Sequence, residues 1–220
     1  MKPNLLCVGN VKAGSTSLNE TLNQHSQIFM AKEKEIHFFD FNYDKGFDWY
    51  ESHFKQHTNE LIVGETTPNY MYRDIFLDRI YNYADDLKII VLIRNPIERA
   101  LSHHNMFYLG GVDKYTTITE SNMFNWYMEK SLCYDRIKQL EDRYDVLCVQ
   151  TEKLDQSYNM IQKWLGVDNE NLIPVRAMVA PSKLDIDIET KKTLLPFFKD
   201  EIENLEEHLG WDLKNYKTVT

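Results

Sequence analysis

Residues 5–22, which read LLCVGNVKAGSTSLNETL, decide the fold of this protein. Residues 5–8 are a short apolar run without helical periodicity that ends at Gly9, which predicts a buried strand. Residues 10–14 form a loop with one cation, Lys12, and residues 15–17 are types that favour the cap of a helix. The first backbone N–H groups of a helix lack partners within it, and the helix dipole favours negative charge there. A strand, a glycine loop and a helix therefore predict a phosphate site in this stretch.

The position of the lysine distinguishes two kinds of phosphate loop. The nucleotide-kinase loop has the pattern G-x-x-x-x-G-K-[ST], and Gly9 and Gly14 have its glycine spacing. Ser15 stands where that pattern has its lysine, and Lys12 lies two residues before the second glycine. This register resembles the sulfotransferase loop that holds the 5′-phosphosulfate of 3′-phosphoadenosine 5′-phosphosulfate (PAPS). The resemblance implies that PAPS contacts Lys12, Ala13, Gly14, Ser15, Thr16 and Ser17. Alone, the stretch is also compatible with a tight strand-to-helix turn and a solvated lysine.

The composition predicts a single globular domain over residues 1–220. No apolar run approaches the roughly 20 residues that span a bilayer, and no signal peptide precedes the first predicted strand. The three cysteines form no C-x-x-C pair, which favours buried, reduced thiols. We therefore expect a cytoplasmic protein without a membrane partner.

The net charge of -9 bears on partners and cofactors. It argues against nucleic acid or a long polyanion as partner, because such proteins usually present a basic face. The sequence still allows a local basic pocket where Lys12, Arg94 and Arg99 converge. The histidines have no ligand spacing such as H-E-x-x-H, so we expect no metal.

A second segment contains the candidate general base. Residues 34–39 read KEIHFF and residues 46–50 read GFDWY, which alone is compatible with a solvated charge run before an aromatic core. The segment resembles the one that follows the phosphosulfate loop in heparan sulfate (Golgi-type) sulfotransferases. The resemblance implies Glu35 as the base, supported by His37, and composition alone leaves Glu33 as a competitor. Burial among aromatic residues is expected to raise the pKa of Glu35.

A departure from the family pattern follows at residues 60–72, which read ELIVGETTPNYMY. They predict a strand at residues 61–63 that breaks at Gly64, followed by a loop at the edge where ligands bind. Sulfotransferases have an E-K-[ST]-x-x-Y-like segment here, and its lysine lies near the transferring sulfate. Thr66 replaces that lysine, which removes one cation and leaves the substrate class open.

The third segment that resembles the family begins with a predicted central parallel strand at residues 87–93, LKIIVLI. Arg94 follows it, and Ser102 lies on the next predicted helix, opened by Asn95-Pro96. The resemblance implies that Arg94 and Ser102 bind the 3′-phosphate of PAPS, a task that suits the planar fork of arginine. It also implies a basic loop late in the chain, in which Lys183 contacts that phosphate. Alone, this stretch favours an ordinary ion pair for Arg94.

The remaining pattern completes an α/β chain. Residues 145–150 predict another buried strand, and residues 188–209 predict a long helix interrupted by Pro196. Alternating strands and helices predict a three-layer α/β/α fold around a mainly parallel sheet. The resemblance identifies it as the P-loop-NTPase-like sulfotransferase fold.

Together these resemblances imply a PAPS-dependent sulfotransferase. It would move a sulfonate from PAPS to a hydroxyl or amine of a carbohydrate or small molecule by in-line displacement, and release 3′-phosphoadenosine 5′-phosphate (PAP). Glu35, Lys12 and His37 would be catalytic, with Lys12 stabilising the bridging oxygen. Two alternatives remain open: a P-loop-type small-molecule kinase, and a non-catalytic PAP-binding relative, which Thr66 suggests. The acceptor and the oligomeric state stay undetermined.

Overall fold

The computed structural model describes residues 2–177 and 187–218. It divides into two compact units. The first comprises Met1–Ile93 and Arg136–Met178, and the second comprises Arg94–Asp135 and Val179–Thr220. The expectation of one domain stays a prediction.

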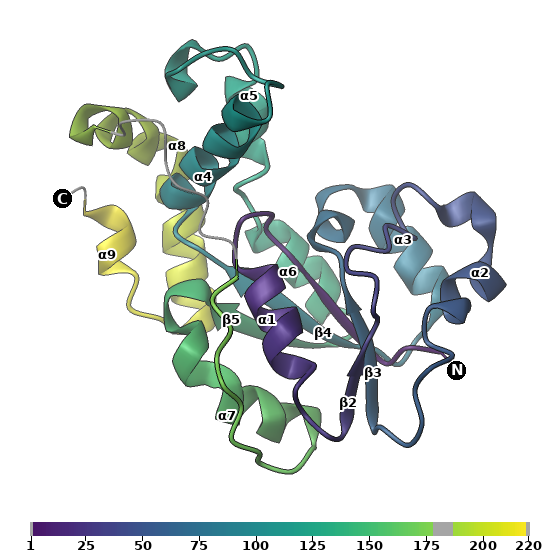
Figure 1. The fold of residues 1–220 in the computed structure, drawn as a ribbon. Helices are drawn as coiled ribbons and strands as arrows, with labels where there is room; N and C mark the ends of the chain where they lie inside the picture. Colours follow the sequence, from purple (N-terminus) through teal and green to yellow (C-terminus); the bar gives the residue numbers. More distant parts are fainter. Residues whose placement is uncertain (1, 178–186, 219–220) are drawn as a thin grey trace. The chain divides into compact units, whose positions relative to one another are not determined.

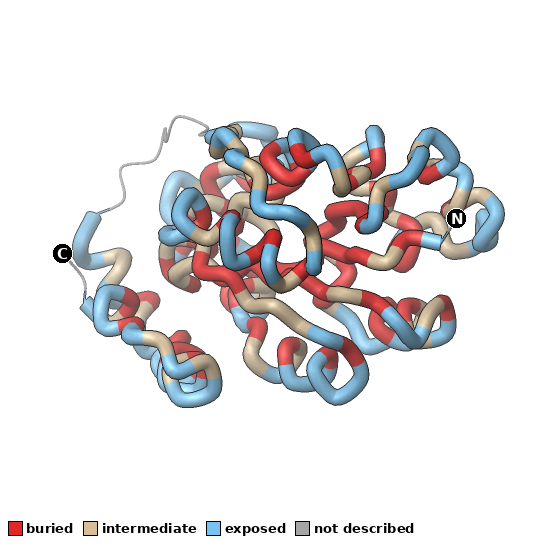
Figure 2. The backbone as a smooth tube through the Cα atoms, turned by 90° about the horizontal axis from the view of Figure 1, so that it is seen from below, coloured by how far each residue is buried: buried red, intermediate tan, exposed pale blue. Residues whose placement is uncertain are grey.

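The first unit is built on a five-stranded parallel sheet in the order β2-β3-β1-β4-β5 (Figure 1). Its strands are β1 (Leu5–Gly9), β2 (Ile28–Met30), β3 (Ile62–Thr66), β4 (Lys88–Ile93) and β5 (Asp145–Gln150). The predicted strands at residues 5–8 and 87–93 are confirmed within one residue at each end. Both are almost entirely buried (Figure 2), because apolar runs without alternation suit strands covered on both faces. Residues 145–150 are a strand as predicted, but it lies at the sheet edge and only its last two residues are buried.

Helices cover both faces of this sheet, which confirms the three-layer α/β fold. One face packs against α1 (Ser15–Leu22) and α7 (Leu154–Leu165), whose apolar stripes share a core cluster with the strands. Further elements of this unit are α2 (Phe47–Ser52), α3 (Asp74–Tyr83), α6 (Tyr134–Glu141, which begins at the unit boundary), and the 3₁₀ turns η1 (Tyr43–Lys45), η2 (Pro68–Tyr72) and η4 (Thr151–Lys153).

β3 corrects one expectation, because it continues through Gly64. A Cβ atom at Gly64 would lie 2.8 Å from both the Cβ and the carbonyl oxygen of Leu5. The glycine therefore permits the close approach of β1 rather than ending the strand. Glu65 and Thr66, expected in a loop, are buried strand residues.

The second unit is helical. Its elements are α4 (Pro96–Leu109), η3 (Ile118–Glu120), α5 (Phe124–Glu129), α8 (Ile188–Leu209) and α9 (Lys214–Lys217). The side chain of Asn95 caps α4 by accepting the N–H of Ile97 at 3.0 Å, which agrees with the predicted helix start. The expected interruption at Pro196 is wrong, because α8 is one continuous helix. Buried Leu194 and Phe198 lie on either side of the proline, so packing outweighs its cost of about 3 kcal/mol.

Candidate active site

The loop between β1 and α1 ends at the start of a helix without a side-chain cap. Gly14 occupies the cap position with a left-handed backbone, φ 89°, and no side chain among the described residues caps the helix. The expectation that residues 15–17 cap it is therefore wrong, since the helix itself begins at Ser15. Uncapped first-turn N–H groups form a site for an anion.

The conformation of this loop is stabilised by its neighbours. The carbonyl of Ala13 accepts a hydrogen bond from Thr151 Oγ1 at 2.8 Å, and the N–H of Val11 donates to Tyr72 Oη at 2.8 Å. Lys12 has φ 70°, a left-handed conformation that is unfavourable for a side chain other than glycine. Asn10 is buried, and its carboxamide has no hydrogen-bond partner among the described residues.

Backbone strain coincides with the candidate catalytic residues. In the part of the chain that the structure describes, the non-glycine residues with positive φ are Lys12, Glu35 (φ 59°) and His37 (φ 54°). Each such conformation costs of the order of 1–3 kcal/mol, and such residues cluster at functional sites. The motif selects these three residues from sequence, and the backbone distinguishes the same three.

Charged contacts surround the carboxylate of Glu35. Lys34 Nζ lies 2.5 Å from Glu35 Oε1, and His37 Nε2 lies 3.4 Å from Glu35 Oε2. The hydrogen bond with His37 lowers the pKa of Glu35 to about 2, with Lys34 adding to the effect and partial burial opposing it. The expected rise in this pKa is therefore wrong, because the two neighbouring cations outweigh desolvation.

The pKa of His37 is shifted in the opposite direction, upward. Its Nδ1 lies 2.8 Å from Asp40 Oδ2, and hydrogen bonds to Asp40 and then Glu35 raise the pKa of His37 to about 9. At neutral pH the site therefore holds an ionised Glu35 beside a protonated His37.

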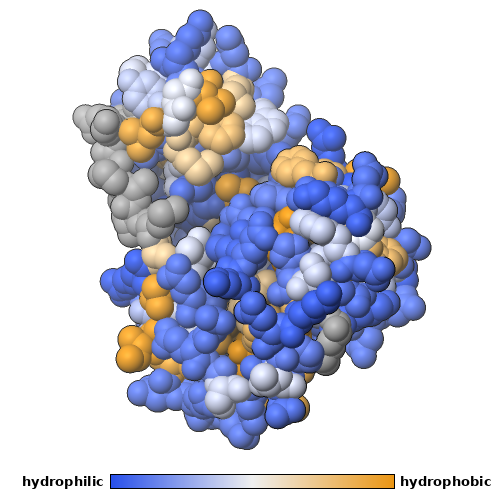
Figure 3. Space-filling model, turned by 45° about the vertical axis from the view of Figure 1, so that its right-hand side comes forward, coloured by the Kyte–Doolittle hydropathy of each residue, from blue (hydrophilic) through white to orange (hydrophobic). Residues whose placement is uncertain are grey.

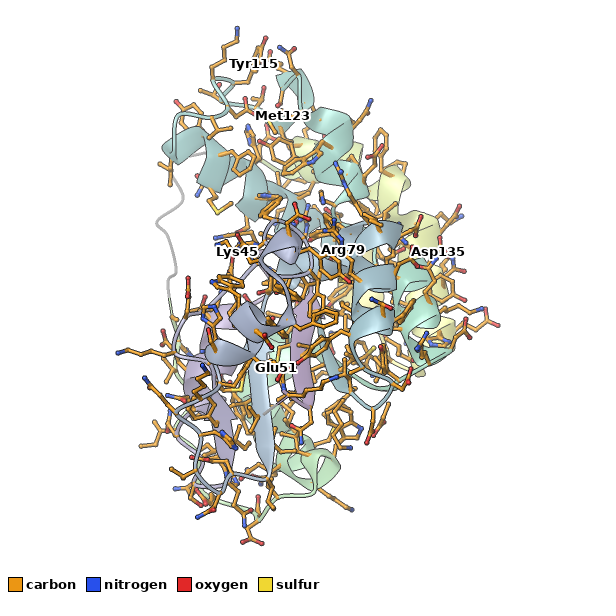
Figure 4. All side chains as sticks on the ribbon, turned by 90° about the vertical axis from the view of Figure 1, so that its right-hand side faces the viewer. Lys45, Glu51, Arg79, Tyr115, Met123 and Asp135 are labelled. Atoms are coloured by element: carbon orange, nitrogen blue, oxygen red, sulfur yellow. The ribbon has the colours of Figure 1, made fainter. Side chains whose placement is uncertain are left out.

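Asp40 is a site residue that sequence reasoning missed. Its buried carboxylate accepts hydrogen bonds from Asn69 Nδ2 at 2.6 Å and from the N–H of Phe41 at 2.8 Å. Burial alone would raise its pKa, but the hydrogen bonds from His37 and Asn69 keep it below the usual value. Arg79, labelled in Figure 4, donates to the carbonyl of Asp40 at 2.9 Å. The sequence signal that could have identified Asp40 is its position three residues after His37.

The parallel sheet places the phosphate loop and the Glu35 segment at the same end, where the strands have their carboxyl ends. The N–H of Glu35 donates to the carbonyl of Thr66 at 3.0 Å, and Thr66 is paired in register with Cys7 of β1. The carboxyl ends of neighbouring parallel strands meet at one edge, so the phosphate loop after β1 and the Glu35 segment share it. Thr66 itself is buried and donates to Asn19 Oδ1 at 2.9 Å, toward α1.

Arg94 and Ser102 belong to the second unit. Arg94 directly follows β4, and Ser102 lies in α4. Arg99 is fully buried within that unit, where it donates to Ser131 Oγ and the carbonyl of Tyr127, each at 2.8 Å. Arg99 is therefore not accessible to the local basic pocket that the sequence allowed.

Lys183 lies outside the described residues. The described chain before it runs along α1 toward the start of that helix. Its N–H groups at Ile173, Val175 and Ala177 donate in turn to the side chains of Gln24, Thr21 and Ser17.

The described residues contain neither a metal-binding cluster nor a membrane-spanning helix. No three His, Cys, Asp or Glu side chains gather there in a way that could hold a metal ion. Nor is any helix among residues 2–177 and 187–218 long and apolar enough to cross a membrane. The face drawn in Figure 3 is mainly hydrophilic, with apolar residues in separate patches.

Comparison with known proteins identifies similar chains. A family model described as a sulfotransferase domain matches residues 2–159. A membrane-associated sulfotransferase, kil1 of Dictyostelium discoideum, is 37% identical over 106 residues, 47% of this chain and 22% of that protein. Human heparan sulfate glucosamine 3-O-sulfotransferase 5 is 33% identical over 110 residues, 49% of this chain and 32% of that protein. The matched stretch thus spans less than a third of each of these relatives.

Solved structures share the fold. A sulfotransferase from Alicyclobacillus acidocaldarius superposes with a TM-score of 0.83 at 22% identity, covering 99% of this chain and 100% of that one. Mouse sulfotransferase SULT7A1, solved in complex with PAP, superposes with a TM-score of 0.59 at 13% identity, covering 97% and 88%.

These relatives contradict one expectation. A cytoplasmic protein was expected from the lack of a signal peptide and of a long apolar run. The matching relatives include a membrane-associated sulfotransferase, and the absence of an apolar run does not determine location.

Proposed function

Because this chain belongs to the sulfotransferase domain family, we propose that it transfers a sulfonate group from PAPS to a hydroxyl or amine of a carbohydrate or small molecule. The observation that carries the proposal is the left-handed backbone shared by Lys12, Glu35 and His37. The phosphate loop and the Glu35 segment both lie at the carboxyl ends of neighbouring strands. Sulfonate transfer needs the donor and the general base close together, as this arrangement allows.

The donor would be held by residues from several segments. The uncapped N–H groups of α1 and the ammonium of Lys12 suit the 5′-phosphosulfate. For the 3′-phosphate, the proposal rests on the motif and assigns Arg94, Ser102 and Lys183. PAP as the released product is supported by the mouse sulfotransferase of the same fold, which binds it.

The chemistry consists of three coupled changes. The acceptor oxygen forms a bond to sulfur, the bond between sulfur and the bridging phosphate oxygen breaks, and the acceptor proton moves to Glu35. Lys12 stabilises the charge that develops on the bridging oxygen. PAP leaves with that electron pair.

The low pKa of Glu35 constrains the timing of proton transfer. A carboxylate with a pKa of about 2 is too weak a base to ionise a free hydroxyl. A hydroxyl becomes strongly acidic once its oxygen has begun to bond to sulfur, and a weak base then suffices. We therefore place proton transfer late in the displacement, with protonated His37 fixing the orientation of the carboxylate.

The relatives indicate a broad class of acceptor. Those with named substrates act on heparan sulfate glucosamine, which supports a carbohydrate as one candidate. The net charge of -9 opposes a long polyanion, so short or neutral acceptors are the better first choice.

One experiment separates this proposal from its alternatives. Calorimetry with PAP and ATP is combined with transfer of labelled sulfonate from PAPS to a panel of alcohols, phenols, amines and oligosaccharides. A sulfotransferase binds PAP and labels an acceptor. Preference for ATP over PAP would indicate the kinase, and PAP binding without transfer to any acceptor would indicate the non-catalytic relative.

A further inference from the structure

The 3₁₀ turn η2 contacts both halves of the candidate active site. Tyr72 Oη accepts the N–H of Val11 at 2.8 Å, and Tyr70 Oη accepts the N–H of Phe38 at 2.8 Å. Val11 precedes Lys12 and Phe38 follows His37, so each bond ends next to a residue with positive φ. Two side chains from one turn therefore stabilise backbone at two separate strained positions.

Buried Glu65 orients Tyr70. Its Oε1 accepts hydrogen bonds from Tyr70 at 2.8 Å and from Tyr50 at 2.9 Å, and its Oε2 accepts from Thr67 at 2.6 Å. Burial raises the pKa of Glu65 to about 6 against the effect of these donors, so the group is mostly ionised at neutral pH. An ionised carboxylate only accepts hydrogen bonds. Tyr70 must therefore donate to it, which leaves a lone pair for the N–H of Phe38.

We propose that Tyr70 and Tyr72 are positioning residues that set the placement of the Glu35–His37 segment relative to the phosphate loop. The inference rests on the proposed function, in which Lys12 and Glu35 act on opposite sides of one displacement. Such a reaction is sensitive to alignment, and a misplacement of about 1 Å costs on the order of a hundredfold in rate. The turn suits this task because Pro68, Tyr70 and Met71 are buried, so both hydroxyls extend from a fixed base.

The test compares three Tyr→Phe variants of the full chain. Tyr50→Phe is the matched control for Tyr70→Phe, since both tyrosines are buried and both donate to Glu65 Oε1, but of the two only Tyr70 accepts a hydrogen bond from the N–H of Phe38, the residue after His37. The measurements are the titration of His37 by NMR, the affinity for PAP by calorimetry, and the melting temperature.

Tyr70→Phe and Tyr72→Phe should each change a different measurement. Tyr70→Phe should move the pKa of His37 from about 9 toward 6.5 and leave the PAP dissociation constant within about twofold of wild type. Tyr72→Phe should raise that constant about fivefold or more and leave the His37 titration unchanged. Tyr50→Phe should lower the melting temperature about as much as Tyr70→Phe and change neither of the other measurements.

Two results would overturn the inference. One is a wild-type His37 titration in Tyr70→Phe, and the other is an equal effect of Tyr50→Phe, which would reduce the cluster to general stability. A wild-type protein that fails to bind PAP would instead refute the proposed function. The His37 titration would then still decide the role of Tyr70, because it needs neither donor nor acceptor.

Discussion

His37 Nε2 lies 3.4 Å from Glu35 Oε2, and the two residues of this pair both have a left-handed backbone. Their pKa values move apart: hydrogen bonds to Asp40 and then to Glu35 raise that of His37 to about 9, and the hydrogen bond with His37, with Lys34 adding to it, lowers that of Glu35 to about 2. The free protein therefore holds a preformed ion pair where the acceptor is expected to react. The predictions below test this pair and its surroundings.

Glu35→Gln preserves shape but removes the proton acceptor. Turnover with an acceptor identified from the panel should fall about 10²–10⁴-fold, the usual contribution of general base catalysis. Steady-state kinetics measures the loss, and PAP affinity and melting temperature should stay near wild type. Glu33→Gln is the control and should be nearly silent, since its side chain is 63% exposed and contacts His53 rather than the site. Retention of more than about a tenth of the activity by Glu35→Gln would contradict its role as base.

The pH dependence of turnover distinguishes Glu35 from His37 as the base. Glu35 is already ionised at any pH well above about 2, so kcat should stay level between about pH 7 and 8.5. It should fall as the pH rises through about 9, where His37 loses the proton that orients the carboxylate. Neutral His37 acting as base would produce the opposite result, a rate that rises with pH up to about 9.

His37 should also make stability depend on pH. Its pKa is raised from 6.5 to about 9 on folding, so the folded chain binds this proton more tightly than the unfolded chain does. The resulting stabilisation is fully present below about pH 6.5 and is lost as the pH rises through about 9. Urea unfolding of wild type and His37→Gln should show a difference in free energy that is largest near pH 6 and shrinks by pH 9.5. A difference that is the same at both pH values would show that His37 is not shifted.

Arg94→Ala tests the 3′-phosphate assignment. Wild type should bind PAP at least about tenfold more tightly than 5′-AMP, because charge-assisted hydrogen bonds to the extra phosphate contribute about 1.5–3 kcal/mol each. The variant should lose most of that preference in calorimetry. Arg143→Ala is the matched control, since Arg143 is a partly exposed surface arginine that pairs with Asp85. Equal affinity of the wild type for PAP and AMP would refute the assignment.

Thr66→Lys introduces the residue that the family pattern has at this position, and we expect it to destabilise the fold. Thr66 is 1% exposed and its hydroxyl bonds to Asn19, so a lysine would carry its charge into a buried site. Thermal and urea unfolding should show a loss above about 3 kcal/mol, against about 1–3 kcal/mol for the isosteric control Thr66→Val. A Thr66→Lys protein as stable as wild type would show that the side chain can leave the core.

The strand positions and the candidate site residues could be read from local sequence. The apolar runs at residues 5–8 and 87–93 lack alternation, and only burial on both faces of a parallel sheet accommodates such runs. The motif around Glu35 and His37 likewise selected residues whose backbone proved to be left-handed. Short-range patterns determined the strands, since the apolar run of each strand consists of neighbours in the chain, whereas resemblance to a family selected Glu35 and His37.

Contacts between distant segments decided the rest. Gly64 continues β3 instead of ending it because Leu5, from another strand, leaves no room for a Cβ atom. The Tyr70 and Tyr72 contacts join segments that are more than thirty residues apart in sequence. Partial burial alone would raise the pKa of Glu35, and His37, whose hydrogen bond lowers it most, is held by Asp40, which in turn accepts a hydrogen bond from Asn69. Electrostatic energy depends on distance and solvent exposure in the folded state, and neither quantity is contained in the order of residues along the chain.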